Sequence, residues 1–368
     1  MSETEDPLLE ATTALVPALL TGLEALAYAG RHLHPSQLPG LIEAIDGFDD
    51  KINAGKTAFD AAPWPEHLHF FRDQLNLAAD AALRAFGGLK ASADDPNGML
   101  KAYRSMRHTT RAVEALYPMS FSLPAINRFF VDVGQRDDEA LWQALNGADP
   151  SREDVGIMNA NNDHEQRGGF SMYVPEYYDS GQAMPLIVAL HGGSGHGADF
   201  LWTWLREARS RGCIVLSPTA RQDTWSLMGP DVDSAPIAKM VEHVMNTWSI
   251  DEDRVLLTGM SDGATFTLVS ALGADTPYTH LAPISGTFHP MLLDGASDLS
   301  GRPIYLTHGA LDWMFPVDIA RMARDALSAA GADVIYREIA DLSHTYPRDE
   351  NPRILDWLID GRRPASDA

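Results

Sequence analysis

Cysteine is almost absent from this sequence of 368 residues. The single one, Cys213, excludes a disulfide within the chain, and the apolar run 213–217 around it predicts a buried structural thiol. The chain begins Met1-Ser-Glu-Thr-Glu-Asp, which is acidic, whereas a secretory signal begins with basic residues. We therefore expect a cytoplasmic protein in a reducing compartment.

Positive charge is also scarce. Lys and Arg number 28 against 51 Asp and Glu, which gives a net charge of −23. A field of that sign repels nucleic acid and anionic membrane surfaces, so we expect neither as a partner. The sequence has no run of 18 apolar residues, which predicts no membrane insertion. It also has no H-E-x-x-H pattern and no paired cysteines, so we expect no metal.

The spacing of apolar residues divides the chain into two regions. Residues 1–148 show helical spacing without the alternation typical of strands, which predicts an all-α N-terminal domain. Its expected helices span about 7–32, 65–87, 97–117 and 123–145. Residues 149–168 are polar with few large apolar side chains, as is typical of a linker.

Residues 169–368 alternate between short apolar runs and helical stretches. The expected strands are 170–174, 186–191, 213–217, 255–259, 280–284, 304–307 and 334–339, and the clearest helices are 198–211 and 235–248. This alternation predicts an α/β fold, with a mainly parallel sheet covered by helices on both faces. Functional loops then gather at the carboxyl ends of the strands.

The most informative motif is the G-x-S-x-G turn Gly259-Met-Ser-Asp-Gly263, which follows an apolar strand and leads into a helix. A sharp turn there lifts the Ser261 hydroxyl above the sheet, and the two glycines let the backbone pass without side-chain clashes. The free N–H groups at the start of the helix point toward the same place. The motif predicts Ser261 as a nucleophile.

A second apolar strand ends in the glycine-rich loop His191-Gly-Gly-Ser-Gly195. Such a loop is typical of the element that stabilises an oxyanion during ester hydrolysis, which requires two fixed backbone N–H groups. We assign one N–H to Asp262, directly after the nucleophile, and the other to Gly193 or Ser194. The alternative is a plain glycine-rich turn after a buried strand.

Two further strand ends supply a candidate acid and base. Asp312 follows the strand 304–307 and His344 follows the last strand, so the order Ser261, Asp312, His344 is that of α/β-hydrolases. In such a triad the histidine accepts the serine proton and the aspartate fixes the imidazole tautomer. The alternatives are that Asp312 is only a turn or cap residue and that His308 is the base.

Residues from about 169 to the end resemble the phospholipase/carboxylesterase branch of the α/β-hydrolase fold. The matching motifs are His191-Gly-Gly-Ser-Gly, Gly259-Met-Ser-Asp-Gly, His308-Gly-Ala-Leu-Asp and Ser343-His344. The resemblance implies a cofactor-free serine esterase that forms an acyl-enzyme on Ser261. The branch also includes acyl-protein thioesterases, feruloyl esterases and dienelactone hydrolases. The last group uses a Cys nucleophile, which disfavours it here.

Aromatic residues near these loops suggest the kind of substrate. Trp225 follows the strand 213–217 and Trp313 follows Asp312, so we expect both to contact a small-molecule ester that is neutral and either short-to-medium in length or aromatic. The alternatives are a thioesterase, a polyester or feruloyl esterase, and a non-catalytic binding protein on the hydrolase fold. The helical domain has three candidate roles: a lid, a docking module, or a dimerisation surface that forms a homo-oligomer.

Overall fold

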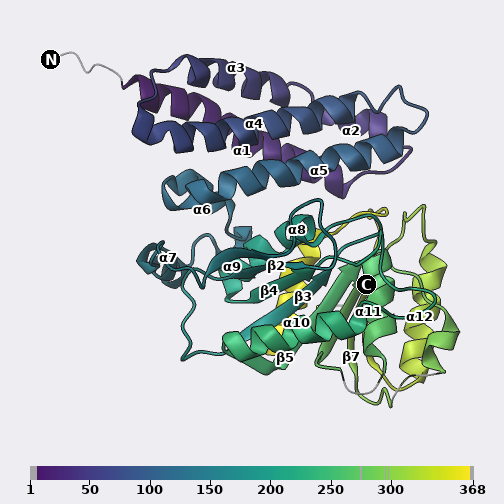
Figure 1. Cartoon of the computed structure of the whole chain (residues 1–368). Coiled ribbons are helices and arrows are strands. Elements are labelled where there is room, and N and C mark those ends of the chain that lie inside the picture. Colours follow the sequence, from purple (N-terminus) through teal and green to yellow (C-terminus); the bar gives the residue numbers. More distant parts are fainter. Residues whose placement is uncertain (1–5, 274–275, 295, 297, 365–368) are drawn as a thin grey trace. The chain divides into compact units, whose positions relative to one another are not determined.

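The computed structural model of this protein describes residues 6–273, 276–294, 296 and 298–364. The chain forms two compact units, Met1–Arg136 and Asp137–Ala368. The first unit is helical and the second is built on a sheet (Figure 1). The boundary therefore lies twelve residues before the expected end of the helical domain at 148.

The first unit is a helical bundle around an apolar core. Its α-helices are α1 (Pro7–Arg31), α2 (Leu38–Ala44), α3 (Phe48–Ala61), α4 (His69–Lys90), α5 (Gly98–Leu116) and α6 (Pro124–Phe129). Asp6 caps α1 by accepting the Leu8 N–H at 3.0 Å, and Pro7 fits the first turn because it has no N–H to satisfy. The leucines of α1 that are buried against α3, α4 and α5 are Leu15, Leu19, Leu23 and Leu26.

By length and composition, α1 could cross a membrane, and it is the one helix among the described residues that passes this test. The sequence-based expectation of no such segment came from counting unbroken apolar runs, which polar residues interrupt in α1. In the bundle the leucine face of α1 is buried by the neighbouring helices, as is typical of a core helix.

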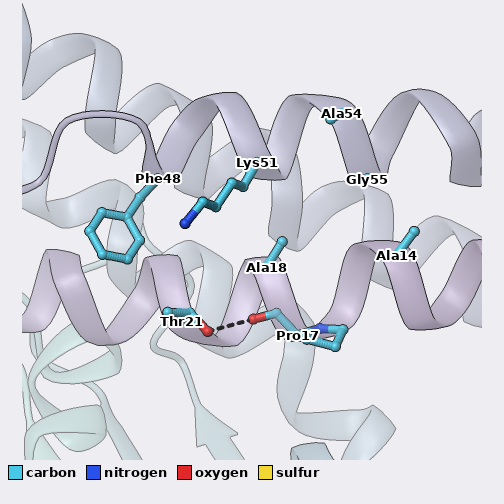
Figure 2. A pocket seen from close by; sticks show the side chains of 8 residues that line it. All are labelled: Ala14, Pro17, Ala18, Thr21, Phe48, Lys51, Ala54 and Gly55. Carbon is cyan, nitrogen blue, oxygen red and sulfur yellow. Dashed lines mark hydrogen bonds between the residues drawn. The ribbon is translucent and has the colours of Figure 1, made fainter.

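A shallow groove of about 530 Å³ runs between α1 and α3 (Figure 2). The two helices lie close together because α3 has a glycine here: a Cβ on Gly55 would lie 2.6 Å from the carbonyl oxygen of Ala14. Lys51 extends from α3 toward α1, with its ammonium 5.5 Å from the ring centre of Phe48 (Figure 2). Small side chains therefore set the spacing of this helix pair.

Several helix predictions for the first unit are wrong in detail. The helix expected at 123–145 is broken into α6, a 3₁₀ turn (Val133–Gln135) and α7 (Glu139–Gly147), which belongs to the second unit. The breaks occur because Asp132 and Asp138 each accept a backbone N–H two residues ahead and start a new helix. The helices α2 and α3 were not predicted, since α2 has only seven residues and α3 buries only Ile52, Gly55 and Phe59.

The helix expected at 65–87 also ends later than predicted, because α4 continues through Gly87-Gly88 to Lys90. A Cβ on Gly88 would collide with the side chain of Ser105 on α5. The glycine therefore serves close packing of α4 on α5 instead of ending the helix.

The second unit is built on one sheet of eight strands. They are β1 (Gly156–Ala160), β2 (Phe170–Val174), β3 (Met184–Leu190), β4 (Ile214–Pro218), β5 (Ile250–Met260), β6 (His280–Ile284), β7 (Pro303–Gly309) and β8 (Asp333–Ile339). Their order is β1-β2-β4-β3-β5-β6-β7-β8, with antiparallel pairs at β1–β2 and β2–β4 and parallel pairs elsewhere. The prediction of a mainly parallel sheet is confirmed, and all seven expected strands are present.

Helices cover both faces of this sheet. They include α8 (Gly197–Phe200), α9 (Leu205–Arg211), α10 (Ser234–Thr247), α11 (Asp262–Ala271), α12 (Val317–Ala329) and α13 (Asn351–Asp360). Alternate residues of β3, such as Leu186 and Val188, join an apolar cluster with residues of α10, α11 and α12. On the other face, Trp357 of α13 packs with its ring centre 5.5 Å from that of Tyr305 on β7. This covering explains why β3 is buried at every position.

The segment 149–168 is not a linker. Its residues Gly156–Ala160 form β1, an edge strand whose side chains are mostly half-buried. Its last residues are bound to the loop after β4, since the Gly168 N–H donates to the Thr219 carbonyl at 3.2 Å. The prediction failed because an edge strand needs few large apolar residues.

Candidate active site

Ser261 lies in the sharp turn between β5 and α11, with φ 57° and ψ −118°. This left-handed region is strained for a residue with a side chain. Hydrogen bonds of 3.0 Å from the Ser261 N–H to the Ile284 carbonyl and from the Thr265 N–H to the Ser261 carbonyl hold the turn. A Cβ on Gly259 would lie 2.5 Å from the carbonyl carbon of Gly263, so the turn needs the flanking glycines that the motif contains.

His344 joins the serine to a carboxylate. Its Nε2 lies 3.0 Å from Ser261 Oγ, and its Nδ1 lies 2.9 Å from Asp312 Oδ2. Because a carboxylate accepts only, Nδ1–H donates to Asp312, and Nε2 of the neutral ring is left to accept the serine proton. The structure thus brings together the three residues that the sequence predicts as a triad.

Asp312 is oriented by the loop that follows β7. Its Oδ1 accepts the backbone N–H groups of Met314 at 3.0 Å and Phe315 at 2.8 Å, which leaves Oδ2 for His344. The Asp312 side chain is fully buried. Asp312 therefore does shape a turn, as the alternative interpretation held, and it contacts the imidazole as well.

His308, the rival base, faces the acid. Its Nε2–H donates to the Phe315 carbonyl at 2.8 Å and lies 3.4 Å from Asp312 Oδ2. Burial lowers the pKa of His308, while the Phe315 carbonyl and the Asp312 carboxylate oppose this shift. His308 therefore contacts the acid and the Phe315 carbonyl, whereas the hydrogen bond to Ser261 comes from His344.

The glycine-rich loop is held by buried side chains beneath it. The neutral His191 ring donates from Nδ1 to the Gly192 carbonyl at 2.7 Å and accepts the Ala220 N–H on Nε2 at 3.1 Å. Burial lowers the pKa of His191 to about 3, so the ring stays neutral in this position. The indole N–H of Trp225 donates to the His191 carbonyl at 2.7 Å.

One of the two candidate oxyanion donors in this loop is already engaged. The Ser194 N–H donates to the Asp223 carbonyl at 2.8 Å. Among the described residues, no hydrogen bond is found from the amide of Gly193 or from that of Asp262, which is the first residue of α11. Gly193 and Asp262 are neighbours, because a Cβ on Gly193 would lie 2.6 Å from Asp262 Oδ2. The geometry therefore favours Gly193 over Ser194.

A known family covers the part of the chain that carries this triad. Residues 231–358 match the phospholipase/carboxylesterase family. The matched segment contains Ser261, Asp312 and His344, whereas the glycine-rich loop precedes it. The family resemblance predicted from the sequence is confirmed there.

Curated relatives of this hydrolase unit are esterases. A bifunctional acetylxylan esterase/xylanase of Neocallimastix patriciarum is 25% identical over 203 residues, covering 52% of this chain and 28% of the relative. Feruloyl esterase B of Talaromyces funiculosus is 27% identical over 167 residues, covering 42% of this chain and 43% of the relative. The chain thus spans less than half the length of these relatives.

Among solved structures, a thermostable esterase is similar over 56% of this chain and 63% of its own, with 22% identity and a TM-score of 0.46. The family match and the curated relatives bear out the prediction of a carboxylesterase-type hydrolase for this unit.

The two tryptophans expected to contact substrate have different surroundings in the hydrolase unit. Trp225 is 3% exposed, and its ring stacks on Phe266 at a centroid distance of 5.4 Å. The structure therefore contradicts substrate contact by Trp225, because its ring and its N–H are both used inside the core. Trp313 is 41% exposed beside Asp312 and stays a candidate.

Two residues that organise the site were not found from the sequence. Thr224 donates its hydroxyl to Asp262 Oδ2 at 2.5 Å and fixes the carboxylate beside the glycine-rich loop. Asp233 is buried, and its Oδ2 accepts both the N–H and the hydroxyl of Ser226. Neither has a motif of its own: Thr224 binds the first residue of α11, and Asp233 binds Ser226 within the loop between β4 and α10.

In the part of the chain that the structure describes, no group of three or more His, Cys, Asp or Glu residues could hold a metal ion.

Proposed function

We propose that this protein is a serine carboxylic-ester hydrolase that works through an acyl-enzyme on Ser261. The observation that carries the proposal is the chain of contacts from Ser261 Oγ to His344 Nε2 at 3.0 Å and from His344 Nδ1 to Asp312 Oδ2 at 2.9 Å. A serine hydroxyl is a weak nucleophile at neutral pH and needs a base in such a position.

In the first half-reaction, the Ser261 oxygen attacks the ester carbonyl carbon while His344 Nε2 takes the hydroxyl proton. The carboxylate of Asp312 stabilises the imidazolium that forms. The tetrahedral intermediate then expels the alcohol, which receives the proton from Nε2, and the acyl group stays on Ser261.

In the second half-reaction, water attacks the acyl-enzyme with His344 again as the base, and the carboxylic acid leaves. Both intermediates carry negative charge on the former carbonyl oxygen. We assign its two donors to the backbone N–H groups of Gly193 and Asp262. Each such donor typically contributes about 10²–10³ in rate.

We propose neutral esters with a short-to-medium or aromatic acyl group as substrates. The names of the curated relatives, acetylxylan esterase and feruloyl esterase, support small acyl and aromatic acyl groups. Trp313 beside the acid supplies an exposed aromatic surface for such a group. The net charge of −23 disfavours polyanionic substrates.

The test is hydrolysis of p-nitrophenyl esters from C2 to C8 by the wild-type protein and Ser261→Ala. We expect kcat to fall on the order of 10⁴–10⁶-fold in the variant. Ser270→Ala is a matched control, because Ser270 lies on α11 and its hydroxyl accepts that of Ser234 at 2.9 Å, away from His344 and Asp312. Turnover by Ser261→Ala close to that of the wild type would refute the proposed nucleophile.

A further inference from the structure

Arg167 joins two loops beside the proposed active site. Its Nη1 donates to the carbonyl oxygen of Gly195 at 2.7 Å, and its Nη2 donates to that of Gln222. Gly195 closes the glycine-rich loop after β3, and Gln222 belongs to the loop after β4. The planar guanidinium therefore bridges two loops that are separate in sequence.

A backbone hydrogen bond also joins the same two loops, between Ser194 and Asp223, the neighbours of Gly195 and Gln222 in the sequence. The Ser194 N–H donates to the Asp223 carbonyl at 2.8 Å, and the turn Gly192–Gly195 is closed by its own hydrogen bond of 3.0 Å. Ser194 has φ 55°, a conformation that needs such support in a residue with a side chain. The direction of the Gly193 N–H depends on these contacts, because Gly193 lies inside the turn that they fix.

The Arg167 guanidinium lies near two carboxylates, those of Asp223 and Asp233. The side chain is half-buried, and among the described residues its Nε is buried without a hydrogen-bond partner. Burial lowers the pKa of Arg167, and the carboxylates of Asp223 and Asp233 oppose that shift. A lysine would keep the charge, but a single ammonium cannot reproduce the fork that reaches both carbonyl oxygens.

We propose that Arg167 is a positioning residue that sets the Gly193 N–H for the oxyanion. It acts through carbonyl oxygens of the two loops and does not contact the triad. The inference rests on the proposed function, because an oxyanion forms only if Ser261 attacks a carbonyl. We call the two hydrogen bonds from Arg167 to the Gly195 and Gln222 carbonyl oxygens the clamp. Contacts to the oxyanion strengthen in the transition state, so loss of the clamp lowers kcat far more than it raises KM.

The test compares Arg167→Ala and Arg167→Lys with the control Arg152→Ala. Arg152 belongs to the same polar segment and also donates to a backbone carbonyl, that of Tyr178 at 2.7 Å. It lies at the other end of the sheet, since the Tyr178 hydroxyl accepts the N–H of Ser249, just before β5 begins. Its removal should leave esterase kinetics unchanged.

With p-nitrophenyl acetate we expect Arg167→Ala to lower kcat by about tenfold to a hundredfold, part of the effect of losing a whole oxyanion donor, with KM changed by about twofold at most. Arg167→Lys should recover only part of the loss. Added guanidinium, far below denaturing concentrations, should raise kcat in Arg167→Ala and have no such effect on Arg152→Ala. A kcat of Arg167→Ala equal to that of Arg152→Ala, or no rescue by guanidinium, would overturn the inference.

Hydrogen exchange tests the clamp without any substrate. In Arg167→Ala we expect faster exchange of the amides in 192–197 and 219–226, reversed by guanidinium, and unchanged exchange in Arg152→Ala. Unchanged exchange in both loops would reject the clamp. If the wild-type protein hydrolyses no ester but Arg167→Ala still shows the faster exchange, the proposed function is refuted and the clamp is retained.

Discussion

Replacing Asp312 by Asn is a sharp test of the site because the structure predicts which way the new amide must face. Oδ1 of Asp312 accepts two backbone N–H groups, from Met314 at 3.0 Å and Phe315 at 2.8 Å. Only the amide oxygen of Asn can take that place. The amide NH₂ then faces His344 Nδ1, where Oδ2 lies now.

Two donors cannot share one hydrogen bond, so the imidazole changes tautomer. Nδ1 of His344 becomes the acceptor and Nε2 carries the proton, and a protonated Nε2 cannot accept a proton from Ser261. The analogous wrong tautomer in a serine protease costs about 10⁴ in kcat, which corresponds to about 5.4 kcal/mol of transition-state stabilisation. We expect a loss of that order here.

The assay is kcat for p-nitrophenyl acetate hydrolysis at pH 7.5, read by release of p-nitrophenolate. Asp318→Asn is the control, because Asp318 is an exposed residue of the next helix that pairs with Arg321 at 2.8 Å. Thermal denaturation of both variants reports whether the fold is kept. A kcat of Asp312→Asn within about tenfold of the wild type would refute the assignment of this carboxylate as the group that orients the base.

Three further outcomes are expected. Gly87→Ala should raise the free energy of unfolding by about 0.5–1 kcal/mol, because the added Cβ meets no atom within 4 Å in the described structure. Gly88→Ala should lower the free energy of unfolding, because its Cβ meets the side chain of Ser105, and urea denaturation compares the two variants. Since burial lowers the pKa of His191 to about 3, the unfolded chain binds this proton more readily, and stability should fall as pH drops below about 6.5, by about 2 kcal/mol at pH 5 from this group. Melting temperatures at pH 7 and pH 5 measure the effect, and a His191→Gln variant with an undiminished pH dependence would contradict it. Trp313→Ala should raise KM for aromatic esters on the order of tenfold without lowering the melting temperature, because the ring is 41% exposed; equal KM values would remove Trp313 from the substrate site.

The sheet of the second unit could be predicted because its strands are buried on both faces. Each of the seven expected strands is an apolar run bounded by loop residues, and β3 is buried at all seven positions. β1 was missed because it lies at the edge and carries no buried side chain, Ile157 and Met158 being half-buried. Likewise α3 was missed because it buries only Ile52, Gly55 and Phe59.

The three residues of the triad were predictable for a similar reason. Ser261 and Asp312 directly follow strands of the parallel sheet and His344 lies in the loop after its last strand, so the topology brings their loops to the same edge without any knowledge of side-chain contacts. The second oxyanion donor could not be chosen this way. The choice between Gly193 and Ser194 depends on the hydrogen bond from the Ser194 N–H to the carbonyl of Asp223, a residue of another loop.

The same distinction explains the error over Trp225. A tryptophan after a strand can point outward to substrate or inward to the core, and the choice depends on a partner for its N–H. Here the partner is the His191 carbonyl, at 2.7 Å, and the ring completes a stack with Phe266. Because the base of the glycine-rich loop uses this indole, the residue supports catalytic geometry from inside the core.

Side-chain contacts to loop backbone therefore position the part of the site that sequence patterns do not reveal. Trp225 and Arg167 each fix a loop by binding backbone groups far away in the sequence, Asp233 binds Ser226 within the loop between β4 and α10, and none of the three belongs to a motif. Nearly every residue has the same backbone N–H and C=O groups, so a sequence pattern cannot show which of them a side chain binds. In the sequence such residues therefore look like ordinary core or surface positions. Their substitution should nevertheless affect turnover, because the N–H of an oxyanion site must be held in place before the charge forms.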